Sequence, residues 1–106
     1  MDCKDDCPVA RAHAVLGGKW TTLIFRDLIG GKRRYSELMR SLDGISPRML
    51  AERLRMLETE GLVTRTVFPT VPPTTEYALT ALGQRMGPVI AAMAEFGQAL
   101  QAQGAR

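Results

Sequence analysis

The stretch Ile45-Ser-Pro-Arg-Met-Leu-Ala-Glu-Arg-Leu-Arg-Met-Leu-Glu-Thr-Glu-Gly-Leu-Val63 decides the fold, because it predicts a helix with both ends marked in the sequence. Ser46 is a favourable N-cap, and Pro47 follows at the first helical position, where a missing N–H is harmless. Gly61 suits the left-handed position that commonly closes a helix. The sequence therefore predicts one helix between Ser46 and Gly61.

The two faces of this helix differ in character. Leu50, Leu54 and Leu57 recur at the spacing of a single helical face, which predicts a buried stripe. The opposite face carries polar side chains, namely Arg48, Glu52, Arg55 and Thr59. A helix with leucines on its buried face and arginines on its exposed face fits a DNA recognition helix. Taken alone, the same pattern also fits an amphipathic surface helix with solvated arginines.

The length and composition predict one compact domain over residues 1–106. The chain is 45% hydrophobic, and we expect its core at about 7–100, with a flexible arm over 1–6 and a flexible tail over 101–106. The net charge is +3, but residues 32–55 alone carry +4. A basic centre in a near-neutral chain favours a surface that faces phosphate.

Several other classes of protein are disfavoured. The acidic N-terminus lacks the apolar core of a signal peptide, and no apolar run is long enough to span a bilayer. We therefore expect a cytoplasmic protein that does not associate with membranes and whose cysteines are reduced thiols. Cys3, Cys7 and His13 are the sole soft ligands, and their spacing is not that of a zinc site. With one histidine and no phosphate-binding loop, we expect no enzyme and no cofactor.

Three shorter helices are predicted before the first one described. They span Pro8–Leu16, Lys19–Leu28 and Tyr35–Leu42, and glycines follow the first two. The Asp43-Gly44 turn then leads directly into the helix that begins after Ser46. Two helices joined by a short turn containing glycine form a helix-turn-helix.

Two strands and a long helical segment complete the chain. Leu62–Phe68 and Thr74–Leu79 alternate as strands do, and the proline-rich segment 69–73 separates them, so they predict an antiparallel hairpin, or wing. After Thr80 an apolar seam begins, along which Pro88 should kink or restart the helix. The fold class is therefore mainly α with a small antiparallel β-hairpin, a winged helix-turn-helix. The seam fits either a dimer interface or packing onto the same chain.

The same residues follow a known family pattern from Cys7 to about Leu100. The matching motifs are Cys7-Pro8, Gly17-Gly-Lys-Trp20, Tyr35-Ser-Glu-Leu38, Gly44-Ile-Ser46, Met49-Leu50, Leu57-Glu58, Gly61-Leu62, Val71-Pro-Pro73, Glu76-Tyr77 and Leu79-Thr80. In this order they resemble the HxlR-type transcriptional regulators, a winged helix-turn-helix branch related to the MarR group. The combination of the Gly-Gly-Lys-Trp, Ile-Ser and Val-Pro-Pro motifs is specific, although each alone is weak.

The resemblance implies a homodimer on double-stranded DNA. It implies dimerisation through the first and last helices, for which the candidates are Val9, Met86, Val89, Ile90, Met93, Phe96 and Leu100. It also implies a pseudo-palindromic operator, with the fourth helix in the major groove and the wing beside the minor groove.

Three groups of residues are candidates for DNA contacts. Those expected at or near base edges are Ser46, Arg48, Met49, Glu52 and Arg55, where Glu52 would accept from cytosine or orient an arginine. Those expected at phosphates, close to helix N-termini, are Lys19, Arg33, Arg34 and Tyr35. Those expected on the wing are Arg65, Thr70 and Thr74.

Cys7 is a candidate redox sensor. It lies at a helix N-terminus, where the helix dipole lowers a thiol pKa, although Asp5 and Asp6 act in the opposite direction. In HxlR-type proteins a cysteine at this position serves some members as a sensor of oxidants or electrophiles. Cys3 departs from the common pattern and would be a resolving thiol. The alternative for Cys7 is an inert thiol.

An alternative function also fits a winged helix. The domain would bind other proteins and have no specific affinity for DNA, but Arg48 and Arg55 on an exposed face argue against this hypothesis. A binding affinity that does not change with salt concentration would support this hypothesis, because phosphate contacts make affinity for DNA fall steeply as salt rises.

Overall fold

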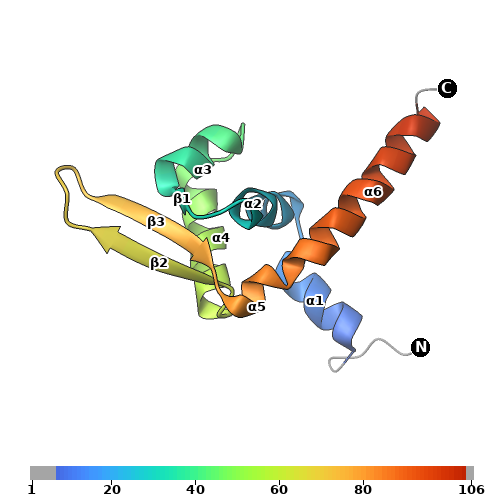
Figure 1. The fold of residues 1–106 in the computed structure, drawn as a ribbon, viewed down its shortest axis with the longest axis horizontal. Helices are drawn as coiled ribbons and strands as arrows, with labels where there is room; N and C mark the ends of the chain where they lie inside the picture. The colour runs from blue at the N-terminus through green and yellow to red at the C-terminus, as the bar shows by residue number, and fades with distance from the viewer. Residues whose placement is uncertain (1–6, 105–106) are drawn as a thin grey trace.

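The wing and the two terminal helices lie at opposite ends of the molecule, with α2 between them (Figure 1). The structure, a computed structural model, describes residues 7–104. Its elements are α1 (Pro8–Leu16), α2 (Lys19–Ile29), β1 (Arg33–Arg34), α3 (Tyr35–Ser41), α4 (Pro47–Thr59), β2 (Val63–Phe68), β3 (Thr74–Leu79), α5 (Ala81–Gln84) and α6 (Met86–Gly104). The predicted class, a mainly helical winged helix-turn-helix, is confirmed.

The sheet has three strands rather than the two that the sequence predicts. β2 and β3 form the expected antiparallel hairpin, in a register that pairs Val63 with Leu79 and Phe68 with Thr74. β1 pairs with the other edge of β3, which gives the strand order β1-β3-β2. A strand of two residues is too short to show alternation in a sequence. Its effect is to attach the start of α3 to the base of the wing.

The leucine stripe of α4 lies at the centre of the core, as predicted. Leu50, Leu54 and Leu57 are at most 1% exposed, and they pack with buried side chains from α2 and α3, among them Phe25 and Leu38. Burying each leucine contributes about 1.5–3 kcal/mol. The stripe therefore determines which face of α4 points to solvent.

Both ends of α4 form as the sequence predicts. The Met49 N–H donates to the hydroxyl oxygen of Ser46 at 3.0 Å, which caps the helix. At the other end Gly61 adopts a φ of +76°, a backbone conformation that is unfavourable for residues other than glycine. The chain can then turn directly into β2.

The C-terminal segment consists of a short helix and a long one. The helix restarts at Met86, two residues before Pro88, as one of the two predicted outcomes. α6 continues through Gly104, and so extends into the segment for which we expect a flexible tail. The predicted arm over 1–6 lies outside the described residues.

A close contact fixes α5 against the start of the wing. Thr80 caps α5 by accepting from the Gly83 N–H at 3.0 Å, and its hydroxyl donates to the Gly61 carbonyl at 2.7 Å. This contact brings the backbone of Gly83 against that of Leu62. A β-carbon at Gly83 would collide with the Leu62 carbonyl oxygen and lie 3.2 Å from Cδ2 of Leu79.

We therefore expect Gly83→Ala to destabilise the domain by about 1–3 kcal/mol, because the added methyl group forces α5 away from Leu62. Urea unfolding followed by circular dichroism measures this change. Gly87→Ala is the matched control, since nothing lies within 4 Å of a β-carbon there. Equal stability of the two variants would show that α5 does not need this close approach.

Candidate nucleic-acid interface

The solvent face of α4 carries the charged side chains that the sequence places there. The Arg48 side chain is 90% exposed, and its Nε donates to Oε1 of Glu52 at 3.2 Å. Glu52 thus orients an arginine in the unbound chain, which is one of the two roles considered for it. Arg55 is also exposed. The front of α4 therefore offers two guanidinium groups that no core packing restrains.

The N-terminal turn of α4 is held in place by α3. The Tyr35 hydroxyl donates to the Pro47 carbonyl oxygen at 3.0 Å, so this side chain joins the two helices of the helix-turn-helix. Met49 is half-buried and packs against the core cluster. The expected phosphate contact of Tyr35 and base contact of Met49 therefore compete with internal contacts that these side chains already make.

The entry into α3 is basic, and its backbone is fixed. The Arg34 N–H donates to Oε1 of Glu37 at 2.8 Å, while Nη1 of Arg33 donates to the Lys32 carbonyl at 3.0 Å. The Arg34 side chain is exposed. Because β1 also pairs with β3, this cationic segment keeps a fixed position beside the wing.

A polar hollow lies between α4 and the wing. Its lining includes Arg55 and Glu58 from α4, Arg65 from β2 and Tyr77 from β3. Burial raises the pKa of the Tyr77 phenol above its ordinary value of 10, while a hydrogen bond and the positive charge from Arg65 oppose that rise. The phenol therefore stays protonated at neutral pH and can donate a hydrogen bond.

The tip of the wing is stabilised by its own threonines. The Thr70 hydroxyl donates to the Pro72 carbonyl at 2.8 Å and lies 3.4 Å from Oγ1 of Thr74. Val71 is fully exposed at the tip. The two threonines proposed for DNA contacts thus shape the turn, whereas Arg65 is exposed on β2.

Lys19 lies at the start of α2, as predicted. Its ammonium nitrogen is 4.5 Å from the ring centroid of Trp20, within the range of a cation–π contact. Trp20 itself packs against the core cluster. Lys19 therefore remains exposed above a fixed aromatic platform.

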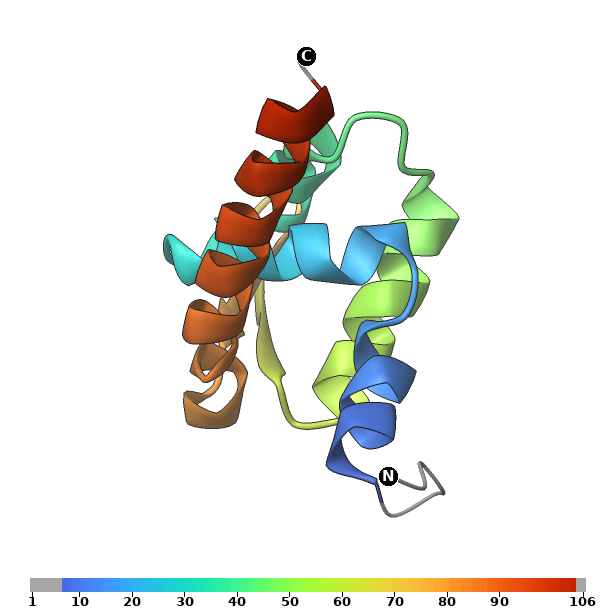
Figure 2. The same cartoon turned by 90° about the vertical axis from the view of Figure 1, so that its right-hand side faces the viewer.

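The proposed dimer residues separate into two groups. Those of the first group are exposed by 41% to 68%, although they are apolar: Val9, Val89, Met93, Phe96 and Leu100. Met86 and Ile90 form the second group, since they are half-buried and pack against the core of their own chain. α1 and α6 both lie on the face that Figure 2 turns toward the viewer.

Cys7 occupies the N-cap position of α1, as predicted, but its side chain is not at the surface. The residue is 5% exposed, and its carbonyl accepts from the Arg11 N–H at 2.9 Å. Cys3 lies outside the described residues. Any reagent that reaches the Cys7 thiol must therefore enter a covered position at the start of α1.

Residues 7–104 contain neither a membrane-spanning helix nor a cluster of metal ligands. No helix in this range has the length and hydrophobicity needed to cross a bilayer. The same residues contain no group of three or more His, Cys, Asp or Glu side chains arranged to hold a metal ion.

Comparisons with known proteins agree with this geometry. A family model described as HxlR-like helix-turn-helix matches residues 15–104. YybR of Bacillus subtilis (strain 168), an uncharacterised HTH-type transcriptional regulator, is 42% identical over 95 residues, which are 90% of this chain and 76% of YybR.

Solved structures extend the likeness to the whole fold. A MarR-family protein from Porphyromonas gingivalis W83 is 39% identical, with a TM-score of 0.88 over 92% of this chain and 96% of that one. The redox regulator HypR in its oxidized form is 42% identical, with a TM-score of 0.81 over 88% of this chain and 96% of that one.

Proposed function

Because the chain belongs to the HxlR-like helix-turn-helix family of transcriptional regulators, we propose that it binds a specific DNA operator as a homodimer. Helix-turn-helix regulators are not a class of enzymes. The proposed operator is pseudo-palindromic, since a two-fold symmetric dimer presents two identical recognition helices to two half-sites.

The exposed front of α4 carries this proposal. Three buried leucines hold the helix from behind, while Arg48 and Arg55 extend into solvent from the side that would enter the major groove. An arginine can donate two hydrogen bonds to O6 and N7 of guanine. Ser46, at the start of the helix, lies where recognition helices approach base edges.

The surroundings of α4 supply the expected backbone contacts. Arg34 lies at the N-terminus of α3, and Arg65 lies on the wing beside the polar hollow. A DNA strand that passes between the major and minor grooves would face this region, which is rich in arginine. Contacts of this kind set position and affinity rather than sequence preference.

The exposed apolar row on α1 and α6 supports the homodimer. Phe96 is 66% exposed and Val9 is 68% exposed, although soluble chains usually bury such side chains. A second copy of the same chain can cover this row by two-fold symmetry, which leaves both recognition helices free.

Cys7 is the proposed redox input to this regulator. HypR, which the chain resembles closely, is a redox regulator of known structure in an oxidized form. In this chain the thiol lies at the start of α1, one residue away from Pro8 and two from the exposed Val9. A disulfide at Cys7 would therefore alter the helix proposed to hold the dimer together.

We expect Arg48→Ala to weaken binding to the DNA upstream of the protein's own gene by about 5- to 150-fold, because a bidentate arginine–guanine contact contributes about 1–3 kcal/mol. Gel shifts at fixed salt measure the affinity. Arg26→Ala is the matched control, since Arg26 lies on α2 and pairs with Asp27. Absence of a shift on any genomic fragment at low salt would instead favour the protein-binding alternative.

Phe96→Glu should convert the dimer to a monomer, because it places a charge in the middle of the exposed apolar row. Sedimentation equilibrium measures the mass, and circular dichroism should show an unchanged fold. Gln98→Glu, an exposed change on the same helix, should remain dimeric. A wild-type protein that sediments as a monomer at micromolar concentration would contradict the proposed assembly.

Diamide should abolish the gel shift of the wild-type protein and leave that of Cys7→Ser intact. Diamide takes two electrons and two protons from a pair of thiols, so a disulfide forms between Cys7 and Cys3 or a second Cys7. Cys3→Ser distinguishes these pairings, and mass spectrometry identifies the bond. A gel shift that diamide does not change would support the role as a DNA-binding regulator and contradict the role of Cys7 as a redox sensor.

A further inference from the structure

The polar hollow between α4 and the wing has a volume of about 360 Å³ and carries an excess of positive charge. Its lining residues are Ala51, Arg55 and Glu58 from α4, Arg65 from β2 and Tyr77 from β3. Two guanidinium groups and one carboxylate leave a net charge of +1. Within residues 7–104 no ion pair joins Glu58 to either arginine. The hollow is therefore suited to an anion.

The register of the sheet directs Arg65 toward this hollow. Arg65 on β2 lies directly opposite Tyr77 on β3. Side chains that lie directly opposite each other on neighbouring strands point to the same face of the sheet. Tyr77 belongs to the core cluster that also contains the leucines of α4. The face that carries Arg65 is consequently the one that looks toward α4.

Tyr77 restrains the Arg65 side chain. The Tyr77 residue is 7% exposed, so core packing holds its ring in place. A hydrogen bond links the two side chains, in which the guanidinium donates and the phenol oxygen accepts. Because a guanidinium group has several N–H donors, the others stay available for a ligand. An arginine that is already oriented loses less conformational entropy when it binds.

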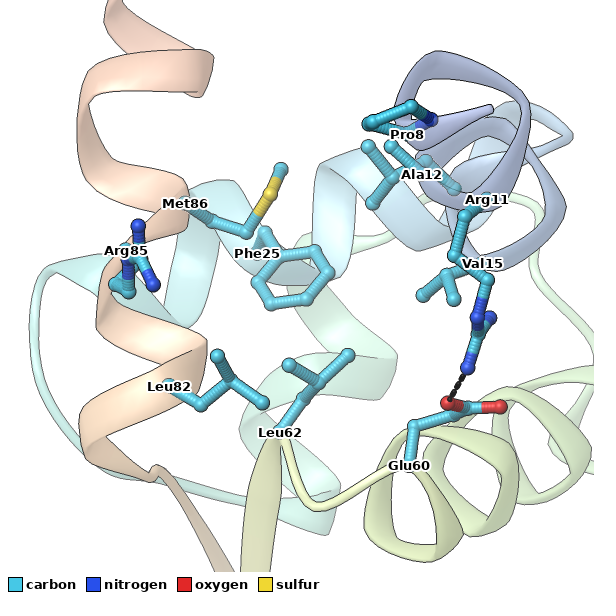
Figure 3. A pocket seen from close by; sticks show the side chains of 11 residues that line it. Pro8, Arg11, Ala12, Val15, Phe25, Glu60, Leu62, Leu82, Arg85 and Met86 are labelled. Carbon is cyan, nitrogen blue, oxygen red and sulfur yellow. Dashed lines mark hydrogen bonds and ion pairs between the residues drawn. The ribbon is translucent and has the colours of Figure 1, made fainter. Parts of the chain in front are cut away.

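Both walls of the hollow are held in place by contacts outside it. On the α4 side, Glu60 at the C-cap pairs with Arg11 of α1, with Nη2 and Oε2 2.8 Å apart (Figure 3). On the wing side, β3 pairs with β1 as well as with β2. The backbone positions that carry Arg55 and Arg65 therefore have a separation that the fold sets.

The rest of the wing supplies no positive charge. No charged residue occurs between Arg65 and Glu76, and Val71 at the tip is apolar and fully exposed. The positive charge of the hairpin is thus concentrated at its base, beside the hollow, and not at the tip that would approach a minor groove. An arginine at this place complements a phosphate group, whose oxygens can accept two of its hydrogen bonds at once.

We propose that the polar hollow receives one phosphate group of the DNA backbone, bound by Arg65, and that Tyr77 is a positioning residue that orients Arg65 for this contact. The proposal rests on the DNA-binding function proposed above. It gives the base of the wing a contact that contributes affinity rather than sequence preference. Arg55 adds positive charge from the α4 wall and remains available for a base edge.

Gel shifts over a range of salt concentrations test the contact. We expect Arg65→Gln to weaken binding by about five- to tenfold, and to reduce the dependence of log affinity on log salt by about one. The loss should be equal for the upstream DNA and for an unrelated fragment of the same length. Arg26→Gln, the same change on α2, should alter neither quantity. A loss confined to the upstream DNA would indicate base readout and overturn the assignment.

Moving the charge to the other face of β2 separates the hollow from the wing as a whole. Arg65→Thr combined with Thr66→Arg keeps the composition and the net charge. It turns the guanidinium away from the hollow, because successive side chains of a strand point to opposite faces. We expect this variant to bind DNA as weakly as Arg65→Gln does. Binding at the wild-type level would show that any arginine on the wing suffices.

A double-mutant cycle tests the role of Tyr77. Tyr77→Phe keeps the ring in the core and removes only the hydroxyl group. We expect about threefold weaker DNA binding when Arg65 is present, and no further loss in the Arg65→Gln background. Circular dichroism should show that both variants are folded. Equal losses in the two backgrounds would mean that the hydroxyl group acts through the stability of the fold, and would overturn the positioning role.

Failure of the phosphate contact can be told apart from failure of the proposed function. A wild-type protein that shifts no DNA fragment at low salt would contradict the DNA-binding function itself. A wild-type protein that binds DNA no more tightly than Arg65→Gln would contradict only the contact in the polar hollow.

Discussion

The burial of three leucines on one face of α4 is the constraint on which the rest of the structure depends. With Leu50, Leu54 and Leu57 excluded from water, rotation of the helix about its axis would expose apolar surface at about 25 cal/mol per Å². The helix therefore has one favourable rotation, and in that rotation Arg48 faces solvent. The exposure of the arginines proposed to contact DNA and the packing of the core thus follow from one periodic pattern, so a change in one would alter the other.

Hydrogen bonds at the turns transfer this fixed orientation to the neighbouring elements. The Tyr35 hydroxyl joins the start of α3 to the start of α4, and the Thr80 hydroxyl joins α5 to the turn at Gly61. Both contacts are made by side chains that also lie at helix boundaries. The wing is consequently held at its base from two directions, by pairing with β1 and by the cap of α5. Its tip is shaped only locally, through Thr70.

Local signals made much of this fold predictable, and contacts between distant residues account for what the sequence missed. Pro8 and Gly61 mark helix ends through their backbone geometry and Ser46 through its hydroxyl, so the limits of α1 and α4 follow from single residues. β1 depends on a partner strand more than 40 positions away, and two residues show no alternation. The Arg11–Glu60 pair spans 49 positions, and no pattern in the sequence indicates it. The seam after Thr80 correctly predicted an apolar face, but Ile90 packs against the core whereas Phe96, further along α6, is exposed to solvent.

The position of α1 explains how the disulfide proposed at Cys7 could act on DNA binding. Cys7 precedes the first turn of this helix, and Arg11, one turn later, contacts Glu60 at the C-terminal end of α4. A disulfide at Cys7 would therefore change how α1 is held against a helix whose rotation its own leucines have already fixed. In the proposed dimer the remaining freedom is the spacing between the two copies of α4, and half-sites one helical turn apart are sensitive to that spacing.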